Sequence, residues 1–333
     1  MSSLLAVDQL RVHFPLAVGG LLRRRWVQLK AVDGVSFTLD AGETLGIVGE
    51  SGCGKSTLGR AILRLLEPTG GRVVWQGEDL GALDARAMRG RRRAMQIVFQ
   101  DPLASLDPRM TIGDIIAEPL TTHEPQLRRA EVRARVQAMM AKTGLLPQMV
   151  NRYPHEFSGG QCQRIGVARA MILNPKLIVC DEPVSALDVS IQAQIINLLM
   201  ELQRDFGLSL LFISHDLSVV RHISQRILVL YLGRMMELAD SASLYRHPRH
   251  PYTRALISAV PLPDPKRERE KRRIVLQGDL PSPLDPPCGC VFRTRCPLAV
   301  EICAREVPPV EQVAAGHQVA CHRWREVGRL PEV

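Results

Sequence analysis

The spacing of hydrophobic and polar residues changes along the chain, and each pattern predicts a different element. Residues 4–14 and 32–39 alternate between apolar and polar side chains, which predicts two β-strands. Residues 15–30, which contain paired glycines and three consecutive arginines, are expected to form an exposed insertion in a hairpin. The short apolar run 44–48 predicts a third strand, and residues 55–66 have the pattern of a helix.

The middle of the chain alternates between helical segments and short apolar runs. Residues 111–172 have a helical pattern. The expected strands there and beyond cover residues 73–75, 95–99, 177–180, 208–213 and 227–230, with helices at 191–206 and 217–222. Apolar strands that alternate with helices indicate a parallel sheet covered on both faces, so we expect an α/β fold.

The last 85 residues differ in composition from the rest of the chain. Residues 261–273 begin with prolines and become densely charged, and residues 281–287 hold four prolines. We expect a linker there, followed by a small Cys-rich appendage at 288–324.

Composition narrows the class of protein. The 333 residues are 46% hydrophobic, which argues against disorder, and no apolar run reaches the roughly 18–20 residues needed to cross a bilayer. We recognise no secretory signal, so the eight cysteines are expected to be reduced thiols or metal ligands in the cytosol. The net charge of +9 leaves a nucleic-acid or anionic-membrane partner open.

A phosphate-binding loop lies between the predicted strand 44–48 and the helix after it. The segment fits the pattern G-x-x-x-x-G-K-[ST] with Gly49, Glu50, Ser51, Gly52, Cys53, Gly54, Lys55, Ser56 and Thr57. Glycines let successive backbone N–H groups point at a phosphate, and the start of the helix adds its positive end. We expect Lys55 to reach the β- and γ-phosphates and the hydroxyl of Ser56 to bind Mg²⁺.

Two acidic residues follow the apolar run 177–180. Asp181 lies at the carboxyl end of a predicted parallel strand, where α/β sheets bind ligands, and its carboxylate suits Mg²⁺. Glu182 follows and is the natural general base for an attacking water.

Several further motifs, in order along the chain, resemble those of the ATP-binding cassette (ABC) ATPases. Phe157-Ser158-Gly159-Gly160-Gln161 is similar to the signature usually written LSGGQ, with Phe157 in place of the usual Leu. Gln100, the segment 185–188 that ends at Asp188, and His215 resemble the Q-loop, D-loop and H-loop.

The resemblance implies a role for each motif. Ser158, Gly159, Gly160 and Gln161 would bind the γ-phosphate of an ATP held by a second cassette, so one chain cannot complete a site alone. Gln100 would sense the attacking water and the Mg²⁺ that it binds with Ser56 and Asp181. His215 would contact the γ-phosphate and steady Glu182, and Asp188 would belong to the same nucleotide site.

The resemblance also implies an architecture. It is a P-loop NTPase cassette with a mixed or parallel core sheet, an antiparallel β subdomain and an inserted helical subdomain at about 101–172. The cassette would span residues 1–248, and residues 249–333 would form a C-terminal extension. For the adenine ring, Phe14 resembles the usual stacking residue, and Trp26 is the alternative.

The tail is similar to the C-terminal extension of peptide-importer ATPases, on the segments 250–256, 280–283 and 289–297. This implies an ATPase that powers oligopeptide import as a heterodimer with a sister ATPase. It would lie under two membrane permeases at the cytoplasmic face of the membrane, and a substrate-binding protein would supply the peptide.

Four tail cysteines raise the question of a metal. Cys290, Cys296, Cys303 and Cys321 lie in a segment with little apolar material, and four thiolates suit zinc or an iron–sulfur cluster. Relatives with this tail are associated with a 4Fe–4S cluster, which we expect here; zinc, with His317 or His322 as further ligands, and free thiols stay open.

Two other functions compete with oligopeptide import. The same kind of ATPase serves other cargo, such as dipeptides, murein peptide, glutathione, nickel or antimicrobial peptides. A cassette acting on nucleic acid would fit the basic charge, but such proteins carry two cassettes or a long coiled coil, so we expect no nucleic-acid partner.

Overall fold

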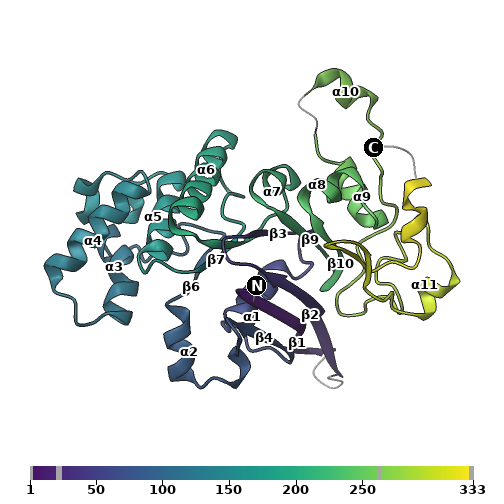
Figure 1. Ribbon diagram of the computed structural model, residues 1–333, viewed down its shortest axis with the longest axis horizontal. Helices are drawn as coiled ribbons and strands as arrows, with labels where there is room; N and C mark the ends of the chain where they lie inside the picture. Colours follow the sequence, from purple (N-terminus) through teal and green to yellow (C-terminus); the bar gives the residue numbers. More distant parts are fainter. Residues whose placement is uncertain (1–2, 20–24, 262–263, 330–333) are drawn as a thin grey trace. The chain divides into compact units, whose positions relative to one another are not determined.

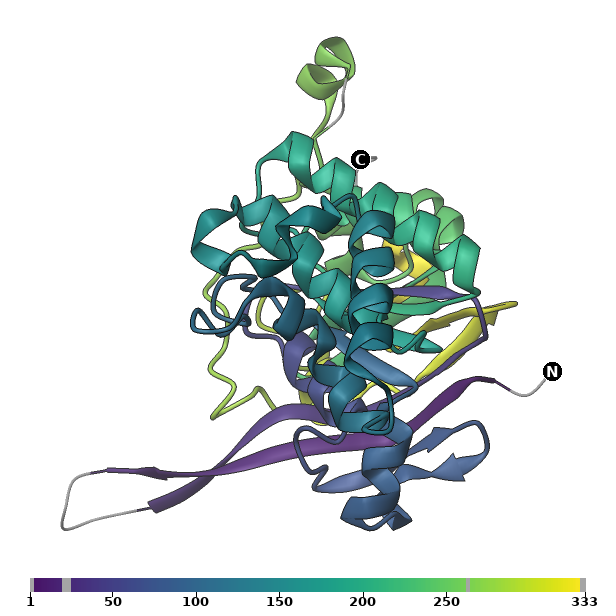
Figure 2. The same cartoon turned by 90° about the vertical axis from the view of Figure 1, so that its left-hand side faces the viewer.

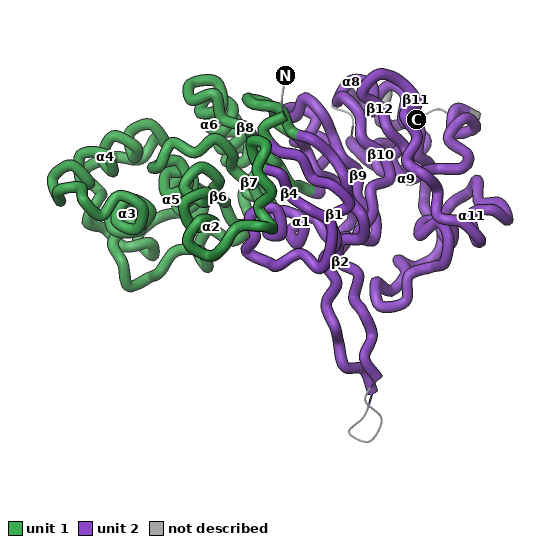
Figure 3. The backbone as a smooth tube through the Cα atoms, turned by 60° about the horizontal axis from the view of Figure 1, so that its bottom comes forward, with its two compact units in different colours: residues 1–4, 39–44, 75–214 green, residues 5–38, 45–74, 215–333 purple. Residues whose placement is uncertain are grey.

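The computed structural model describes residues 3–19, 25–261 and 264–329. The chain forms two compact units, each assembled from separate stretches of sequence (Figure 3). The first unit consists mainly of Trp75–Ser214 together with Leu39–Thr44. The second unit combines Leu5–Thr38 and Leu45–Val74 with the residues from His215 onward.

The first unit is built on three parallel strands. Strand β7 (Leu177–Asp181) pairs with β6 (Met95–Val98) on one side and with β8 (Ser209–Ile213) on the other. Every residue of β7 and β8 is buried, as expected for apolar strands covered on both faces. The parallel register brings the ends of β7 and β8 level, with Asp181 opposite Ile213.

Apart from these strands, the first unit is mainly helical. The stretch predicted to be helical forms three helices that pack on one another, on the left of Figure 1. Arg-rich residues 86–93, expected only to separate two strands, form most of a further helix that begins after Asp84, whose carboxylate accepts the N–H of Ala87 at 2.7 Å. The elements are α2 (Ala85–Arg92), α3 (Ile112–His123), α4 (Arg129–Lys142), α5 (Gly159–Met171), α6 (Val189–Phe206), the short strand β5 (Glu78–Asp79) and 3₁₀ helices at Leu80–Ala82, Pro147–Asn151 and Pro154–Glu156.

The second unit contains a mixed sheet. Strand β3 (Thr44–Val48) is parallel to β9 (Arg226–Tyr231), which is antiparallel to β10 (Arg234–Asp240). Beyond β10, the chain adds β12 (His317–Val319) and β11 (Glu311–Ala314), both antiparallel to their neighbours. Parallel and antiparallel pairs in one sheet agree with the expected mixed core.

A second sheet in this unit contains β2, β1 and β4 in that order. Strands β1 (Leu5–Val18) and β2 (Arg25–Leu39) are far longer than β4 (Gly70–Trp75) and run side by side as a long projection (Figure 2). The expected insertion at 15–30 is therefore largely a continuation of both strands, because alternation of apolar and polar residues does not reveal where an exposed hairpin stops. Residues 20–24, with two of its arginines, lie outside the described residues.

The remaining helices of the second unit are short. Helix α1 packs on β1, and α8 and α9 pack on β10. These helices are α1 (Lys55–Ile62), α7 (Leu217–Ile223), α8 (Ser241–Arg246), α9 (Pro251–Ser258), α10 (Pro265–Glu270) and α11 (Glu301–Arg305), with a 3₁₀ helix at Trp324–Arg329. Among the described residues, no helix combines the length and apolar character that crossing a bilayer requires.

The separate Cys-rich extension is not confirmed. The tail lies on the second unit, because β12 pairs with β10 and the N–H of Ala320 donates to the carbonyl of Met236 at 2.9 Å. Phe292 is fully buried against Tyr231 and Tyr252. A tail poor in apolar residues folds because the sheet of the second unit supplies its core.

Candidate nucleotide site

The phosphate loop of the second unit joins the buried strand β3 to α1. Gly54 caps the helix in the left-handed region, with φ at 101°, and a Cβ there would lie 2.0 Å from the carbonyl oxygen of Ala31. The position therefore requires glycine. Lys55 is buried, and its Nζ donates to the carbonyls of Gly49 at 2.9 Å and Glu50 at 3.1 Å.

Neighbouring elements of the second unit fix this loop. The N–H of Gly233, in the turn between β9 and β10, donates to the carbonyl of Cys53 at 2.9 Å. Ser56 and Thr57 lie in the first turn of α1 and are partly exposed, whereas Cys53 is buried, and burial raises the pKa of its thiol. The loop thus presents its hydroxyls and backbone while the thiol faces inward.

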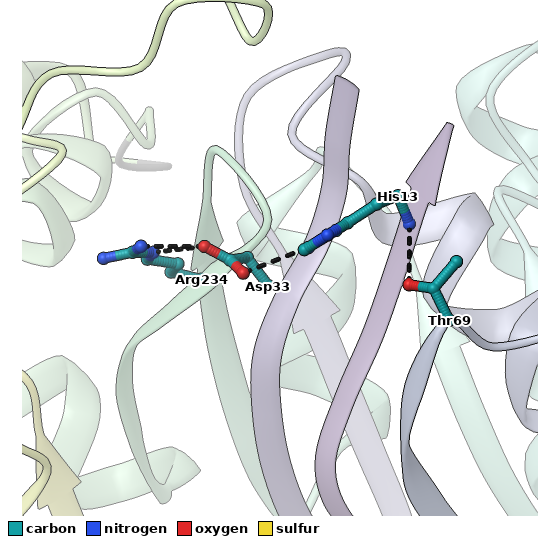
Figure 4. A network of polar contacts seen from close by, with 4 residues as sticks. All are labelled: His13, Asp33, Thr69 and Arg234. Carbon is teal, nitrogen blue, oxygen red and sulfur yellow. Dashed lines mark hydrogen bonds and ion pairs between the residues drawn. The ribbon is translucent and has the colours of Figure 1, made fainter. Parts of the chain in front are cut away.

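A polar network ties β10 to the hairpin strand that supports the loop (Figure 4). Arg234 donates to Asp33 at 2.7 and 3.0 Å, and His13 contacts the other oxygen of the same carboxylate at 3.1 Å. Although burial would raise the pKa of Asp33, hydrogen bonding to Arg234 holds it below its ordinary value. The backbone N–H of His13 donates to Thr69 at 3.1 Å. The sequence does not predict this network, because His13, Asp33 and Arg234 come from three separate strands and Thr69 lies just before a fourth.

Two aromatic residues for the adenine ring belong to this unit. Phe14 follows His13 in β1 and is half-buried, while Trp26 in β2 is 68% exposed. Both positions stay open as stacking residues.

His215 follows β8 in sequence and is exposed just before α7, whose N-terminus is capped by Asp216.

The first unit carries the acidic residues at the end of β7. Asp181 is 1% exposed, and the Nε2 of Gln100, which follows β6, donates to the carboxylate of Glu182 at 3.1 Å. Glu182 has a left-handed φ of 47°, unusual for a residue with a side chain. The structure therefore brings together the residues predicted for the Q-loop and the general base.

The signature segment begins helix α5. Ser158 caps the helix, its hydroxyl accepting the N–H of Gln161 at 3.4 Å, while the side-chain oxygen of Gln161 accepts the N–H of Ser158 at 3.0 Å. This capping box aims the first N–H groups of a 13-residue helix outward. Ser158 and Gln161 are exposed, as an anion site for a second molecule requires.

The D-loop is a neighbour of the signature within the first unit. A Cβ on Gly159 would lie 3.6 Å from Cδ2 of Leu187, in the segment 185–188, and a Cβ on Gly160 would lie 2.5 Å from Cγ2 of Ile191 in α6. Asp188 caps α6 by position, yet its carboxylate makes no capping hydrogen bond, and the next residue, Val189, is 82% exposed.

The tail cysteines do not form a recognisable metal site. Across the described ranges, no group of three or more His, Cys, Asp or Glu side chains is arranged to hold a metal ion. Burial raises the pKa of Cys296 to about 11 and of Cys321 to about 12, with Cys290 and Cys303 close enough to add to the shift. The arrangement thus gives the expected iron–sulfur cluster and its zinc alternative no support.

The proposed histidine ligands for zinc have other contacts. His317 is paired with the fully buried Glu237 at 2.7 Å, and His322 Nε2 lies 3.2 Å from the carbonyl of Glu306. Glu237 also accepts the N–H groups of Arg249 and His250 at 2.6 and 2.9 Å. Sequence reasoning missed Glu237, because a glutamate in a strand looks like an exposed position.

Family models match two parts of the chain. The model described as ABC transporter matches residues 32–185, and the model described as oligopeptide/dipeptide transporter, C-terminal region, matches residues 236–303. The second match covers part of the tail that joins the second unit.

Known proteins match nearly the whole chain. It is 60% identical over 323 residues to the oligopeptide transport ATP-binding protein OppF of Salmonella typhimurium, covering 96% of this chain and 95% of that one. It is 55% identical over 323 residues to AppF, the oligopeptide transport ATP-binding protein of Bacillus subtilis, covering 97% and 98%. A solved dimer of the ATP-binding cassette MJ0796, bound to ADP and Pi, is 28% identical with a TM-score of 0.63, covering 71% of this chain and 98% of that one.

Proposed function

This chain belongs to the ATP-binding cassette (ABC) family of transporter ATPases, and from that membership we propose that it binds and hydrolyses ATP to power oligopeptide import. The cargo comes from the relatives, which are oligopeptide transport ATP-binding proteins along nearly their whole length. Dipeptides, murein peptide, glutathione and nickel are the alternative cargoes.

The observation that carries the proposal is the geometry of the phosphate loop. A left-handed glycine, a buried lysine held by two loop carbonyls, and the start of α1 together form a backbone cradle for phosphate. Lys55 would neutralise β- and γ-phosphate charge.

The oxygen donors suit Mg²⁺, a hard cation that prefers such ligands. Ser56, Asp181 and Gln100 would hold it, and when bound it would offset the charge on the phosphates. Glu182, oriented by the hydrogen bond from Gln100, would accept the proton of the attacking water. His215 would donate a hydrogen bond to the γ-phosphate.

A second cassette completes the site in this proposal. Ser158 and Gln161 are exposed at the start of α5, and the signature glycines Gly159 and Gly160 lie near Leu187 and Ile191, the residues on either side of Asp188 and Val189–Ser190. We infer a heterodimer with a sister ATPase, two membrane permeases, and a peptide-binding protein that acts through the permeases.

We further propose that residues 1–248 act as the cassette, with a helical subdomain at about 101–172, and that residues 249–333 form the family's C-terminal extension. The protein would act at the cytoplasmic face of the plasma membrane as a peripheral subunit. Its net charge of +9 supports this position, because Lys and Arg near anionic lipid are worth about 1 kcal/mol each.

Besides ATP and Mg²⁺, we propose an iron–sulfur cluster, and its ligands would be Cys290, Cys296, Cys303 and Cys321. This part of the proposal rests on the four cysteines that the tail sequence holds; among the described residues their side chains are not arranged as a metal site. Visible absorption with iron and zinc analysis of anaerobically purified protein decides among a cluster, zinc and free thiols. A colourless, metal-free sample would reject both metal assignments.

The central test uses Glu182→Gln in the assembled transporter. We expect ATP binding to be retained, while ATP hydrolysis and uptake of labelled oligopeptide fall by at least about 100-fold, the range typical for a lost general base. Hydrolysis at the parental rate would reject Glu182 as the base. A complex that hydrolyses ATP without importing peptides would reject the cargo.

A further inference from the structure

We propose that the C-terminal tail is a positioning element of the nucleotide site, in which Arg295 and Tyr252 hold Glu50 and thereby fix the shape of the phosphate loop. The inference rests on the proposed ATP-binding function and assigns a role to residues outside every nucleotide motif.

Contacts at Glu50 come from two separate parts of the tail. The backbone N–H of Glu50 donates to the hydroxyl of Tyr252, in α9, at 2.9 Å. The guanidinium of Arg295 donates to its carboxylate at 2.7 Å, and the side chain of Arg295 is only 11% exposed. A charged pair so little exposed is less weakened by water than a surface pair.

The same residue is tied into the loop through its carbonyl. That oxygen accepts hydrogen bonds from the N–H of Cys53 at 3.2 Å and from the Nζ of Lys55 at 3.1 Å. Glu50 therefore joins the tail, through its side chain and N–H, to the lysine expected to bind phosphate. A shift of Glu50 would move the groups that hold Lys55.

The tail is anchored firmly enough to act on the loop. Phe292, three residues before Arg295, is fully buried, with its ring centroid 5.3 Å from that of Tyr231 and 5.4 Å from that of Tyr252. The hydrogen bond to Glu50 is the largest cause that raises the pKa of Arg295, so the guanidinium stays charged. The pair thus connects two ordered parts of one unit.

This arrangement has a reciprocal consequence. If the tail stabilises the ATP-binding shape of the loop, ATP binding must stabilise the tail by the same coupling free energy. Packing alone would give no such response, because a purely structural contact does not distinguish between ATP-bound and ATP-free loops.

The test titrates the full-length chain with a fluorescent ATP analogue and Mg²⁺. Arg295→Met and Tyr252→Phe should each weaken binding on the order of tenfold, as expected when a charge-assisted or buried hydrogen bond is lost. Arg295→Lys should recover part of the affinity, because it keeps the charge without the planar fork. The matched control is Arg293→Met, since Arg293 contacts Cys288 within the tail.

Hydrogen exchange supplies the second readout. ATP should slow the exchange of amides 288–296 in the parent and in Arg293→Met, but not in Arg295→Met. The proposal is overturned if folded Arg295→Met and Tyr252→Phe bind the analogue like the parent, or if ATP leaves tail exchange unchanged. A parent chain that binds no ATP would instead reject the proposed function and this inference with it.

Discussion

Glu182 is held in a costly backbone conformation by several hydrogen bonds. Its φ of 47° is left-handed, which costs a side-chain-bearing residue about 1–3 kcal/mol. Three hydrogen bonds compensate, since its N–H donates to Ile213 at 3.0 Å and its carbonyl accepts the N–H and hydroxyl of Ser185 at 3.3 and 3.1 Å. These hydrogen bonds fix the backbone, and the carboxylate accepts the hydrogen bond from Gln100.

At the same scale, Gly54→Ala should damage the phosphate loop. The new Cβ would meet the carbonyl of Ala31 at 2.0 Å, so we expect the free energy of unfolding to fall by about 2–4 kcal/mol, with loss of ATP binding. Chemical denaturation and ATP titration measure the two effects. Gly52→Ala is the matched control, because its φ is also positive but nothing lies within 4 Å. Equal losses of unfolding free energy in both variants would contradict the steric argument.

Elements near the site differ in how well the sequence predicts them. Strands β7, β8 and β9 are predictable from continuous apolar runs, and the phosphate loop and signature are local patterns. Strand β10 is not, because its buried Glu237 interrupts the apolar run and is stabilised by His317, a residue 80 positions away. Strands β11 and β12 are too short to give a pattern; β12 forms on the edge of β10, and β11 forms in turn on the edge of β12.

Helix α5 is expected to control the loop that follows Gln100. The guanidinium of Arg169 donates to the carbonyl of Ser105 at 2.8 Å, and burial lowers its pKa. In Arg169→Met, amides 101–106 should exchange about 10- to 150-fold faster, the equivalent of about 1.5–3 kcal/mol for a lost hydrogen bond to a charged donor. Hydrogen exchange with mass spectrometry measures this.

The matched control for that loop is Arg164→Met in the same helix. Arg164 bonds Thr143 at 2.9 Å and Gln194 at 3.1 Å, and neither contact lies in the loop. Its variant should leave the exchange of 101–106 unchanged. Equal acceleration in both variants would mean that Arg169 acts only through the general stability of α5.

For the whole molecule, residues far apart in sequence determine what single motifs cannot. The ATP motifs were predicted from local spacing, whereas the Arg295–Glu50 contact spans 245 positions and has no local signature. For the same reason, the local pattern predicts a separate appendage, although the tail pairs with β10 in the second unit. Burial of the tail also buries titratable groups, and these link the stability of the protein to pH.

Stability should fall in mild acid because of His250. This residue is 1% exposed, its ring accepts the N–H of Tyr252 at 3.0 Å, and burial lowers its pKa to about 3. As the pH falls, His250 therefore takes up a proton in the unfolded chain before it does so in the folded protein. The contribution of His250 to the free energy of unfolding is complete above about pH 6.5 and is lost towards pH 3, at about 1.4 kcal/mol per pH unit.

The comparison variant is His250→Asn, which keeps an acceptor for the helix cap but does not titrate. Urea denaturation at pH 7, 6, 5 and 4 should show the parent losing stability more steeply than the variant below about pH 6. Parallel curves would show that His250 does not set the pH dependence.

The support of the phosphate loop by Arg295 also has a consequence for synthesis on the ribosome. Glu50 leaves the ribosome early, but the arginine that holds it is made 245 residues later. At about 5–20 residues per second, that delay is roughly 10–50 s. During this interval the nascent chain carries a phosphate loop without the hydrogen bond from Arg295, so an ATPase truncated before the tail would be released without that support.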